Sequence, residues 1–294
     1  MSLAAAWMLT SFLVATPTTD VPATLDEVTV ESTRRRTLER SAHHFVHELT
    51  HALPESLSRW SVPVCPLVAG FSRAEGNWLL ARLSQRIREV GAPLAAESCE
   101  PNLYVVVTAD PAAFLTAWRK RDKRLYGDGY EARIRRFVAD ERAVRVWHNV
   151  SFDSPTAGLN ATDSPAASLP GKFGDARLTQ SYSATRLQYT EVRGFATVIA
   201  IVDPRSLAGL PLGALGDYLV MTALTELDPD TRIEGVPSIL SLFRNGRYDA
   251  TAPTEWSAWD AAFLTGLYSS DPRETTQRSV IATRIVEAVG GSPH

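Results

Sequence analysis

The chain has 294 residues, of which 45% are hydrophobic and 21% charged, and its formal net charge is −3. This is the composition of an ordinary globular protein, long enough for one large domain or two small ones. A net charge so close to zero excludes a general attraction to nucleic acid or to anionic lipid, so a partner of either kind would need a local basic patch.

The N-terminus carries an apolar segment from Leu3 to Ala15, followed by a stretch rich in Thr and Pro. Thirteen residues are too few to span a bilayer as a helix, but they match the apolar part of a signal peptide with small residues at its cleavage site. No Lys or Arg precedes Arg34, which a start codon assigned too far downstream would explain. The strongest later apolar run, Phe195–Val202, has eight residues and is also too short to span. We therefore expect a leader at 1–22 and a periplasmic or secreted protein.

A short strand is expected at 27–32, and the helix after it, ending at Pro54, contains the sequence HHFVHELTHAL. Within it, His47-Glu48-x-x-His51 has the HExxH spacing of zinc metallopeptidases. In such a site, two histidines one helical turn apart supply two zinc ligands and the glutamate polarises the zinc-bound water. A third protein ligand completes the site.

Three features of the sequence favour a surface helix over a catalytic one. Extension to HExxHxxGxxH would need a glycine and a histidine where the chain has Pro54 and Leu57, and the other candidate for the third ligand is Glu75. At about 100° per residue, the apolar side chains of this helix gather on one side and its histidines on the opposite side. The motif also comes early in the chain, before a sheet that would form the upper wall of a zincin cleft.

Two interpretations of the motif therefore stay open. In the first, the stretch is a histidine-rich surface helix and the protein has no cofactor. In the alternative, the protein is a zinc metallopeptidase in which His47 and His51 bind zinc and Glu48 acts as the catalytic residue.

The two cysteines, Cys65 and Cys99, each lie beside a proline-marked turn. Neither belongs to a CxxC pair, so a redox motif or a cysteine zinc site has little support. Two buried free thiols are one interpretation, and a disulfide, which agrees with an exported chain, is the other. We predict the Cys65–Cys99 disulfide.

Helices and strands alternate along the rest of the first half. Ser72 is expected to cap a helix that Gly91 ends, and Asp110-Pro111 to open another. The expected helices span 72–90, 110–121 and 130–140, and the expected strands span 103–108 and 143–152.

A second half follows a segment, residues 153–182, that is rich in Ser, Pro, Gly, Ala and Asp and is interpreted as a long surface loop. A strand is expected at 196–202, then helices at 212–227, 237–243 and 255–268, and a last helix opened by Asp271-Pro272. The order of strand and helix predicts an α/β (α+β) fold, a mixed sheet flanked by helices. Residues 23–294 would form a single domain, or two subdomains, 23–152 and 183–294, joined by the loop.

Basic residues gather in one part of the sequence. From Trp118 to Val146 there are ten Lys and Arg against five Asp and Glu. The basic patch at 119–146 is either the solvated side of helices or a surface for an anionic partner. It lacks the aromatic and glycine pattern of a nucleic-acid-binding module.

Segments of the second half follow one another as they do at the end of a metzincin-like domain: Asp203, the helix Gly213–Leu227, Pro237-Ser238-Ile239, Glu255–Asp260, then Leu264, Leu267, Tyr268 and Asp271. The chain thus resembles a domain in which an active-site helix is followed by a turn and a final helix. Trp60-x-x-Pro63-x-Cys65-Pro66 and Pro101–Val106 are similar to an uncharacterised family of secreted proteobacterial proteins in which the active-site helix is degenerate.

This resemblance implies a zincin-like second half without zinc. At the positions of two ligands and the catalytic acid, the chain has Asp217, Met221 and Tyr218. A thioether is a poor zinc ligand and tyrosine does not replace the acid, so no hydrolytic centre is expected there. Met221 and Leu224 are expected to pack in the core.

Other catalytic patterns are absent from the sequence, which has no GxSxG, no P-loop and no GxGxxG. A carboxylate pair drawn from Asp203, Asp217, Glu226 or Asp260 stays open. The sequence therefore predicts an exported, non-enzymatic binding protein of unknown ligand, with the zinc metallopeptidase as the alternative.

Overall fold

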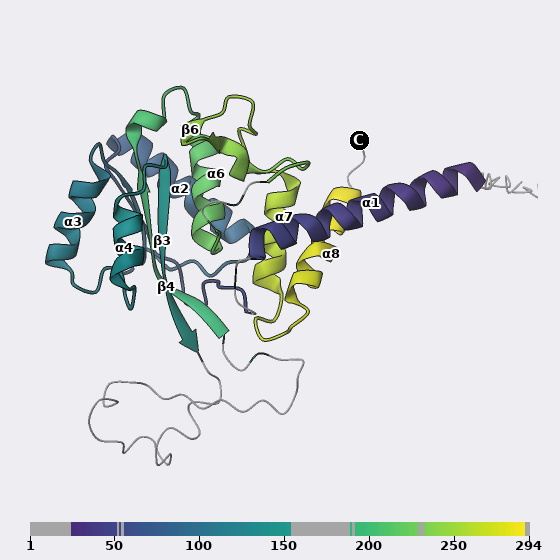
Figure 1. Cartoon of the computed structure of the whole chain (residues 1–294), viewed down its shortest axis with the longest axis horizontal. Coiled ribbons are helices and arrows are strands. Elements are labelled where there is room, and N and C mark those ends of the chain that lie inside the picture. Colours follow the sequence, from purple (N-terminus) through teal and green to yellow (C-terminus); the bar gives the residue numbers. More distant parts are fainter. Residues whose placement is uncertain are drawn as a thin grey trace, which may run out of the picture.

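The computed structural model describes residues 25–51, 53, 56–153, 189, 192–228, 231 and 233–291. The expected leader at 1–22, and the expected loop at 153–182 apart from its first residue, lie outside the described residues. Within the described part, the fold is mixed α/β, as predicted, with a four-stranded sheet flanked by helices (Figure 1).

The sheet has the strand order β1-β2-β4-β3, with bounds β1 Pro66–Ala69, β2 Leu103–Val107, β3 Val144–Asp153 and β4 Val192–Val202. β1, β2 and β4 run parallel, and β3 is antiparallel to β4. Val105 of β2 lies opposite Val68 of β1 and Ala200 of β4. Because β4 comes from the second half and lies between β2 and β3, the two halves of the chain share one sheet.

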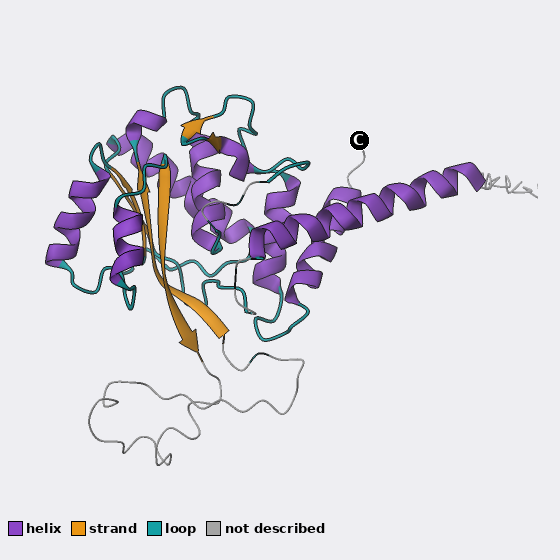
Figure 2. Cartoon of the chain, viewed as in Figure 1, coloured by secondary structure: helices purple, strands orange, loops and turns teal. Residues whose placement is uncertain are grey.

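Helices cover both faces of this sheet (Figure 2). One face carries α2 (Arg73–Glu89) and α6 (Leu212–Leu224), and the other carries α3 (Pro111–Arg121) and α4 (Glu131–Val138). Strand residues alternate between the two faces. Val105 packs in the cluster with α2 and α6, whereas Val106 packs in the cluster with α3 and α4, and Ala200 and Ile201 divide in the same way. This is the period of two that a strand imposes on its side chains.

Three more helices pack together beyond α2 and α6: α1 (Leu25–Thr50), α7 (Ala258–Ser269) and α8 (Gln277–Gly290). The C-terminal half of α1 buries Phe45 and Leu49, and the ring of Phe45 meets Trp259 and Phe263 edge to face at 5.7 and 6.1 Å. The N-terminal half of α1 projects away from the body of the molecule (Figure 1).

Three sequence-based expectations are wrong, and the first concerns the helix expected at 237–243, which is only a 3-10 helix over Ile239–Leu242 followed by a strand that begins at Phe243. Residues 27–32 are not a strand, because α1 already begins at Leu25. The alternation of Val28 and Val30 suits a strand, but a strand needs a neighbouring strand, whereas the hydrogen bonds of a helix are local. The last helix begins at Gln277 rather than at Pro272, because the Asp271 side chain accepts a hydrogen bond from the backbone N–H of Arg273 in a turn.

The local signals for helix ends at Ser72, Asp110 and Gly91 are confirmed. Ser72 caps α2 in a capping box with Glu75, and Asp110 caps α3 by accepting a hydrogen bond from the N–H of Ala113 at 2.9 Å. Gly91, with φ of +74°, follows the end of α2 in the left-handed region that favours glycine. The short elements are η2 (Pro204–Ser206), η3 (Ile239–Leu242), β5 (Phe243–Arg244) and β6 (Arg247–Tyr248).

The predicted disulfide is present. Cys65, just before β1, is bonded to Cys99 in the loop before β2, with their Cα atoms 6.0 Å apart. The described part of the chain has no helix that is both long and apolar enough to cross a membrane.

Replacing both cysteines, Cys65→Ala with Cys99→Ala, should lower the free energy of unfolding by about 3–4 kcal/mol. The physical reason is that the bond closes a loop over a separation of 34 residues and so restricts the unfolded chain. Urea denaturation followed by circular dichroism measures the change. An unchanged free energy of unfolding in this variant would contradict the prediction. So would the alkylation of two free thiols in the native, unreduced wild-type protein.

Candidate functional site

The helix that carries the HExxH spacing has a single buried side, as predicted. Phe45 and Leu49 are buried, whereas the side chain of His47 is 70% exposed. The rings of His47 and His51 stack with centroids 5.6 Å apart and planes 20° apart. A carboxylate oxygen of Glu48 lies 3.5 Å from Nδ1 of His47. The motif therefore lies on the outside of the molecule.

Within the described part of the chain, no third zinc ligand joins these side chains. Glu75, the candidate from the sequence, is engaged in the capping box of α2. Among the residues that the structure describes, no three His, Cys, Asp or Glu side chains come together in a way that would hold a metal ion. Glu48 and His44 border a recess of about 120 Å³ that the segment 233–236 closes on its other side.

A larger groove, of about 900 Å³, runs between α1 and α8. Its floor includes Ala282 and Val286, and its α1 wall carries arginines. Two of its charged side chains already pair within their own helices, Glu39 with Arg35 and Glu287 with Arg284. The groove brings together no set of groups that suits acid–base or nucleophilic catalysis.

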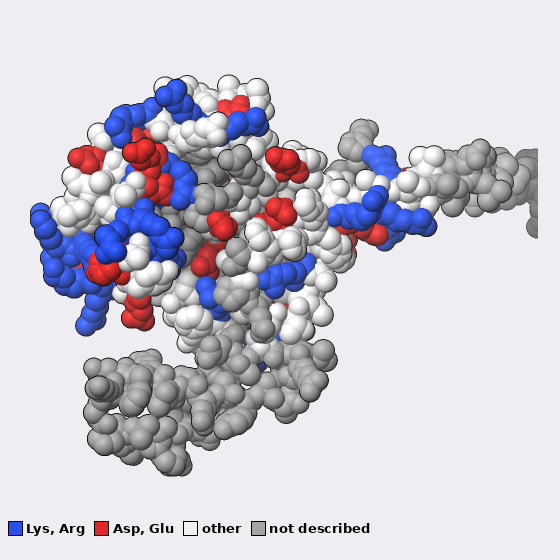
Figure 3. Space-filling model, in the orientation of Figure 1, with Lys and Arg blue, Asp and Glu red and all other residues white. Residues whose placement is uncertain are grey.

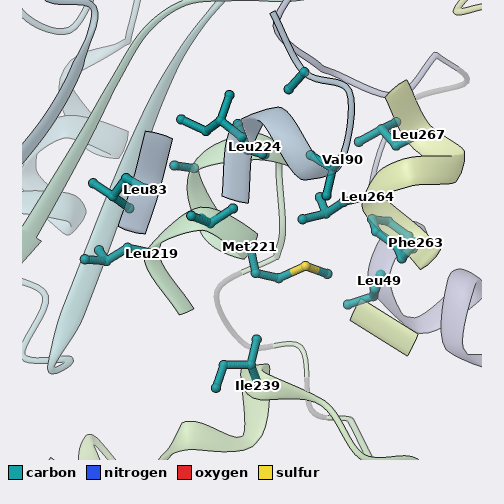
Figure 4. Packing of buried hydrophobic residues seen from close by; sticks show 14 of the residues in the cluster. Leu49, Leu83, Val90, Leu219, Met221, Leu224, Ile239, Phe263, Leu264 and Leu267 are labelled. Carbon is teal, nitrogen blue, oxygen red and sulfur yellow. The ribbon is translucent and has the colours of Figure 1, made fainter. Parts of the chain in front are cut away.

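Met221 and Asp217, which the resemblance to metzincins placed at ligand positions, have structural roles. Met221 is fully buried among apolar side chains, including Leu264 and Phe263 (Figure 4). Leu224 is buried in the same cluster. The packing predicted for Met221 and Leu224 is confirmed.

Asp217, on the same helix, is clamped by two arginines. Its carboxylate accepts hydrogen bonds from Arg82 at 2.8 and 2.9 Å and from Arg86 at 3.0 Å twice. The backbone N–H of Trp256 donates a further bond at 3.0 Å, and the guanidinium of Arg86 lies 4.1 Å from the centroid of the Trp256 ring. Burial alone would raise the pKa of Asp217, but the bonds from Arg86 and Arg82 hold this pKa below its ordinary value. The carboxylate ties α2, α6 and the segment before α7 together.

The other carboxylates from the sequence each have partners of their own. Asp203 pairs with Arg205, which lowers the pKa of that carboxyl. Asp260 is fully buried and accepts hydrogen bonds from the backbone N–H groups of Ile239 and Ser257 at 2.9 and 2.8 Å. Burial raises the pKa of Asp260 against these bonds. In the described structure, these carboxylates hold loops and helix ends and form no catalytic pair.

Glu226 belongs to a buried cluster that the sequence analysis missed. One of its oxygens accepts hydrogen bonds from the Ser58 hydroxyl at 2.6 Å and from Arg193 at 2.7 Å. His148 lies in β3, its ring 4.8 Å from the ring of Phe195. Nε2 of His148 lies 3.0 Å from the carbonyl oxygen of Thr222, and because a carbonyl only accepts, this nitrogen carries the proton.

This cluster does not form a nucleophile with its base. Ser58 is 1% exposed and its hydroxyl donates to a carboxylate rather than to an imidazole. Burial lowers the pKa of His148 from 6.5 to about 4, although the charge of Glu226 acts in the opposite direction. The sequence carried one signal for the cluster, since His148 takes an otherwise apolar position in the alternation with Val144, Val146 and Val150.

Basic side chains gather over α3 and α4, toward the left edge of the molecule in Figure 3. Residues 119–136 contain eight Lys and Arg against three Asp and Glu. The exposed members of this basic surface are Lys120, Arg121, Lys123, Arg124, Arg135 and Arg136.

Two further arginines of the same segment are engaged. Arg119 pairs with Glu131, and the guanidinium of Arg133 lies 4.3 Å from the centroid of the Trp147 ring. The ion pair joins α3 to α4, and the stacking contact joins α4 to β3. The exposed residues therefore lie on a rigid support.

Comparison with protein-family models, with curated proteins and with solved structures found no significant match.

We expect Glu48→Gln to leave the free energy of unfolding unchanged within about 0.5 kcal/mol, because the side chain lies on the polar side of α1. On the same helix, Leu49→Ala should cost about 2–4 kcal/mol, because Leu49 is 1% exposed in the core. Chemical denaturation of the two variants gives the comparison. Equal effects of the two substitutions would show that the buried side of α1 has been assigned wrongly.

Acidification from pH 6.5 toward pH 4 should destabilise the fold through His148, since its folded pKa lies below its unfolded value. In this window the unfolded chain binds a proton that the folded chain does not, so stability is lost as the pH falls, by up to roughly 3 kcal/mol. His148→Gln, which retains an N–H donor for Thr222, should flatten the dependence in urea denaturation curves across this window. His44→Gln, an exposed control, should not. An unaltered slope in His148→Gln would contradict the assignment.

Proposed function

We propose that the protein is an exported, non-catalytic binding protein and that the basic surface on α3 and α4 binds an anionic partner. The observation that carries this proposal is the uneven distribution of charge. Residues 119–136 carry a net charge of +5 in a chain whose total is −3, so the remaining residues carry −8. Such a concentration of positive charge attracts an anionic partner to the face that carries the basic surface.

The exposed side chains of the basic surface suit electrostatic recognition. Six of them, Lys120, Arg121, Lys123, Arg124, Arg135 and Arg136, are exposed. Exposed basic groups near an anionic membrane contribute about 1 kcal/mol each, and this contribution is screened by salt within about 10 Å at 0.1 M ionic strength. Several such groups on two packed helices favour a partner with many negative charges, such as the headgroup layer of an anionic membrane.

Export is the second part of the proposal. The Cys65–Cys99 disulfide supports it, because such bonds persist in oxidising compartments, and the apolar segment at Leu3–Ala15 supports a leader. A periplasmic or secreted location follows.

A binding role is favoured over catalysis by the engagement of the buried polar groups. Asp217, Glu226 and Asp260 each hold parts of the fold together. The relation to the uncharacterised secreted family, with a zincin-like second half, stays part of this proposal, and the burial of Met221 in the apolar core agrees with the absence of a zinc ligand at that position. The alternative, a zinc metallopeptidase with Glu48 as its catalytic residue, has no third ligand in the described part.

Binding to vesicles of phosphatidylglycerol and phosphatidylcholine tests the basic surface. The chain should sediment with mixed vesicles at low salt. It should be released at about 0.5 M salt, because salt at this concentration screens exposed charges beyond a few ångströms. It should not sediment with vesicles of phosphatidylcholine alone, which carry no net charge. The variant Lys120→Glu, Arg124→Glu, Arg136→Glu should lose most of the binding.

The matched control is Arg73→Glu, Arg88→Glu, Arg247→Glu, which changes the total charge equally at exposed arginines of other surfaces. This control should bind the vesicles at least about tenfold more tightly than the first variant, because only the basic surface would meet the membrane. Equal losses in the two variants, or binding that resists salt, would contradict the proposed surface.

A further inference from the structure

We propose that His47 and His51 form a two-ligand surface site for a divalent transition metal ion such as Zn²⁺. The site is separate from the basic surface and does not depend on the proposed function. It differs from a metallopeptidase centre because it supplies two protein ligands and no catalytic residue.

The spacing and support of the two imidazoles suit chelation. They stand one helical turn apart, with ring planes 20° apart and a centroid distance of 5.6 Å, and both are exposed to solvent. The helix beneath them is held by the buried side chains of Phe45 and Leu49. Arg278 of α8 fixes the end of α1, since it donates to the Thr50 hydroxyl at 3.0 Å and to the Thr50 carbonyl at 3.3 Å. The two ligands are thus presented by a rigid element.

The hydrogen bonding of the rings frees the nitrogen that a metal needs. Nδ1 of His51 lies 3.0 Å from the carbonyl oxygen of Glu48, which can only accept, so Nδ1 carries the proton and Nε2 has a free lone pair. Nδ1 of His47 lies 3.5 Å from the Glu48 carboxylate, which favours the same tautomer. Histidine ligands of metals commonly direct their second ring nitrogen to a carbonyl or a carboxylate in this way.

The same geometry separates this site from a hydrolytic one. The carboxylate of Glu48 lies beside Nδ1 of His47, whereas the metal would sit at Nε2, the other ring nitrogen. Glu48 is therefore not placed to polarise a metal-bound water. Zinc prefers four ligands, so with two protein ligands at least two positions would be filled by water. The ion would therefore exchange readily and would not be needed for folding.

Calorimetric titration of the untagged full chain with zinc chloride tests the site. We expect saturable binding of one zinc per chain, and His47→Ala and His51→Ala should each weaken it by at least about tenfold, because each removes one of two ligands. Both side chains are exposed, so neither variant should lose its fold. The matched control is His43→Ala, which removes an exposed histidine one turn earlier on α1 and should leave the affinity unchanged.

Several results would overturn the assignment. One is zinc binding that survives in both His47→Ala and His51→Ala. Another is an equal loss in His43→Ala, which would place the ligands at other histidines of α1. A chelator that lowers the unfolding midpoint by several degrees would reveal a closed structural site with further ligands. Vesicle binding by His47→Ala should equal that of the wild-type chain, which keeps this test distinct from that of the basic surface.

Discussion

The central strand β4 must be covered on both faces, because Val198–Val202 are all apolar and have no exposed surface. Pairing with β2 on one side and with β3 on the other satisfies its backbone groups. α2 and α6 cover one face, and α3 and α4 cover the other. The outer sides of α3 and α4, which carry the basic surface, are exposed because their inner sides cover this strand.

The buried carboxylates of Asp217 and Glu226 are neutralised by arginine side chains that contact them directly. Breaking a buried ion pair by removing one partner typically costs about 3–5 kcal/mol, whereas the pair itself contributes little net stability. The Asp217 carboxylate therefore holds elements of the fold in place, since two arginines and a backbone N–H donate hydrogen bonds to its oxygens. The same reasoning applies to Glu226, whose partners Ser58 and Arg193 come from distant parts of the chain.

The groups available for outside partners lie on the surface of two rigid helical layers. The basic surface belongs to the layer of α3 and α4, and the His47–His51 pair belongs to the layer of α1, α7 and α8 on the other side of the sheet (Figures 1 and 3). Each is held by a buried side of its own helix, with Ile134 and Phe137 under α4 and Phe45 and Leu49 under α1. The two proposed partners, an anionic surface and a metal ion, would therefore be bound at separate places on the surface without any change in the core.

The sequence by itself determined the features that depend on neighbours a few residues away. Ser72 and Asp110 predicted helix starts because a cap bonds within its own first turn, and the single apolar side of α1 follows from its period. The Cys65–Cys99 disulfide was also predicted, because the chain has no third cysteine. The expectation of a strand at 27–32 was wrong because two valines in alternation fit a strand or a helix equally well until the neighbouring strands are known.

Only the tertiary structure decided the partners of the polar groups, because these partners are far apart in sequence. Arg82 and Asp217 are 135 residues apart, and Ser58 and Glu226 are 168 residues apart, so no local pattern joins them. The HExxH spacing shows the same limit. Its two histidines were placed side by side by the helix alone, but whether a third ligand reaches them depends on the packing of other elements, and in the described part of the chain that packing brings none.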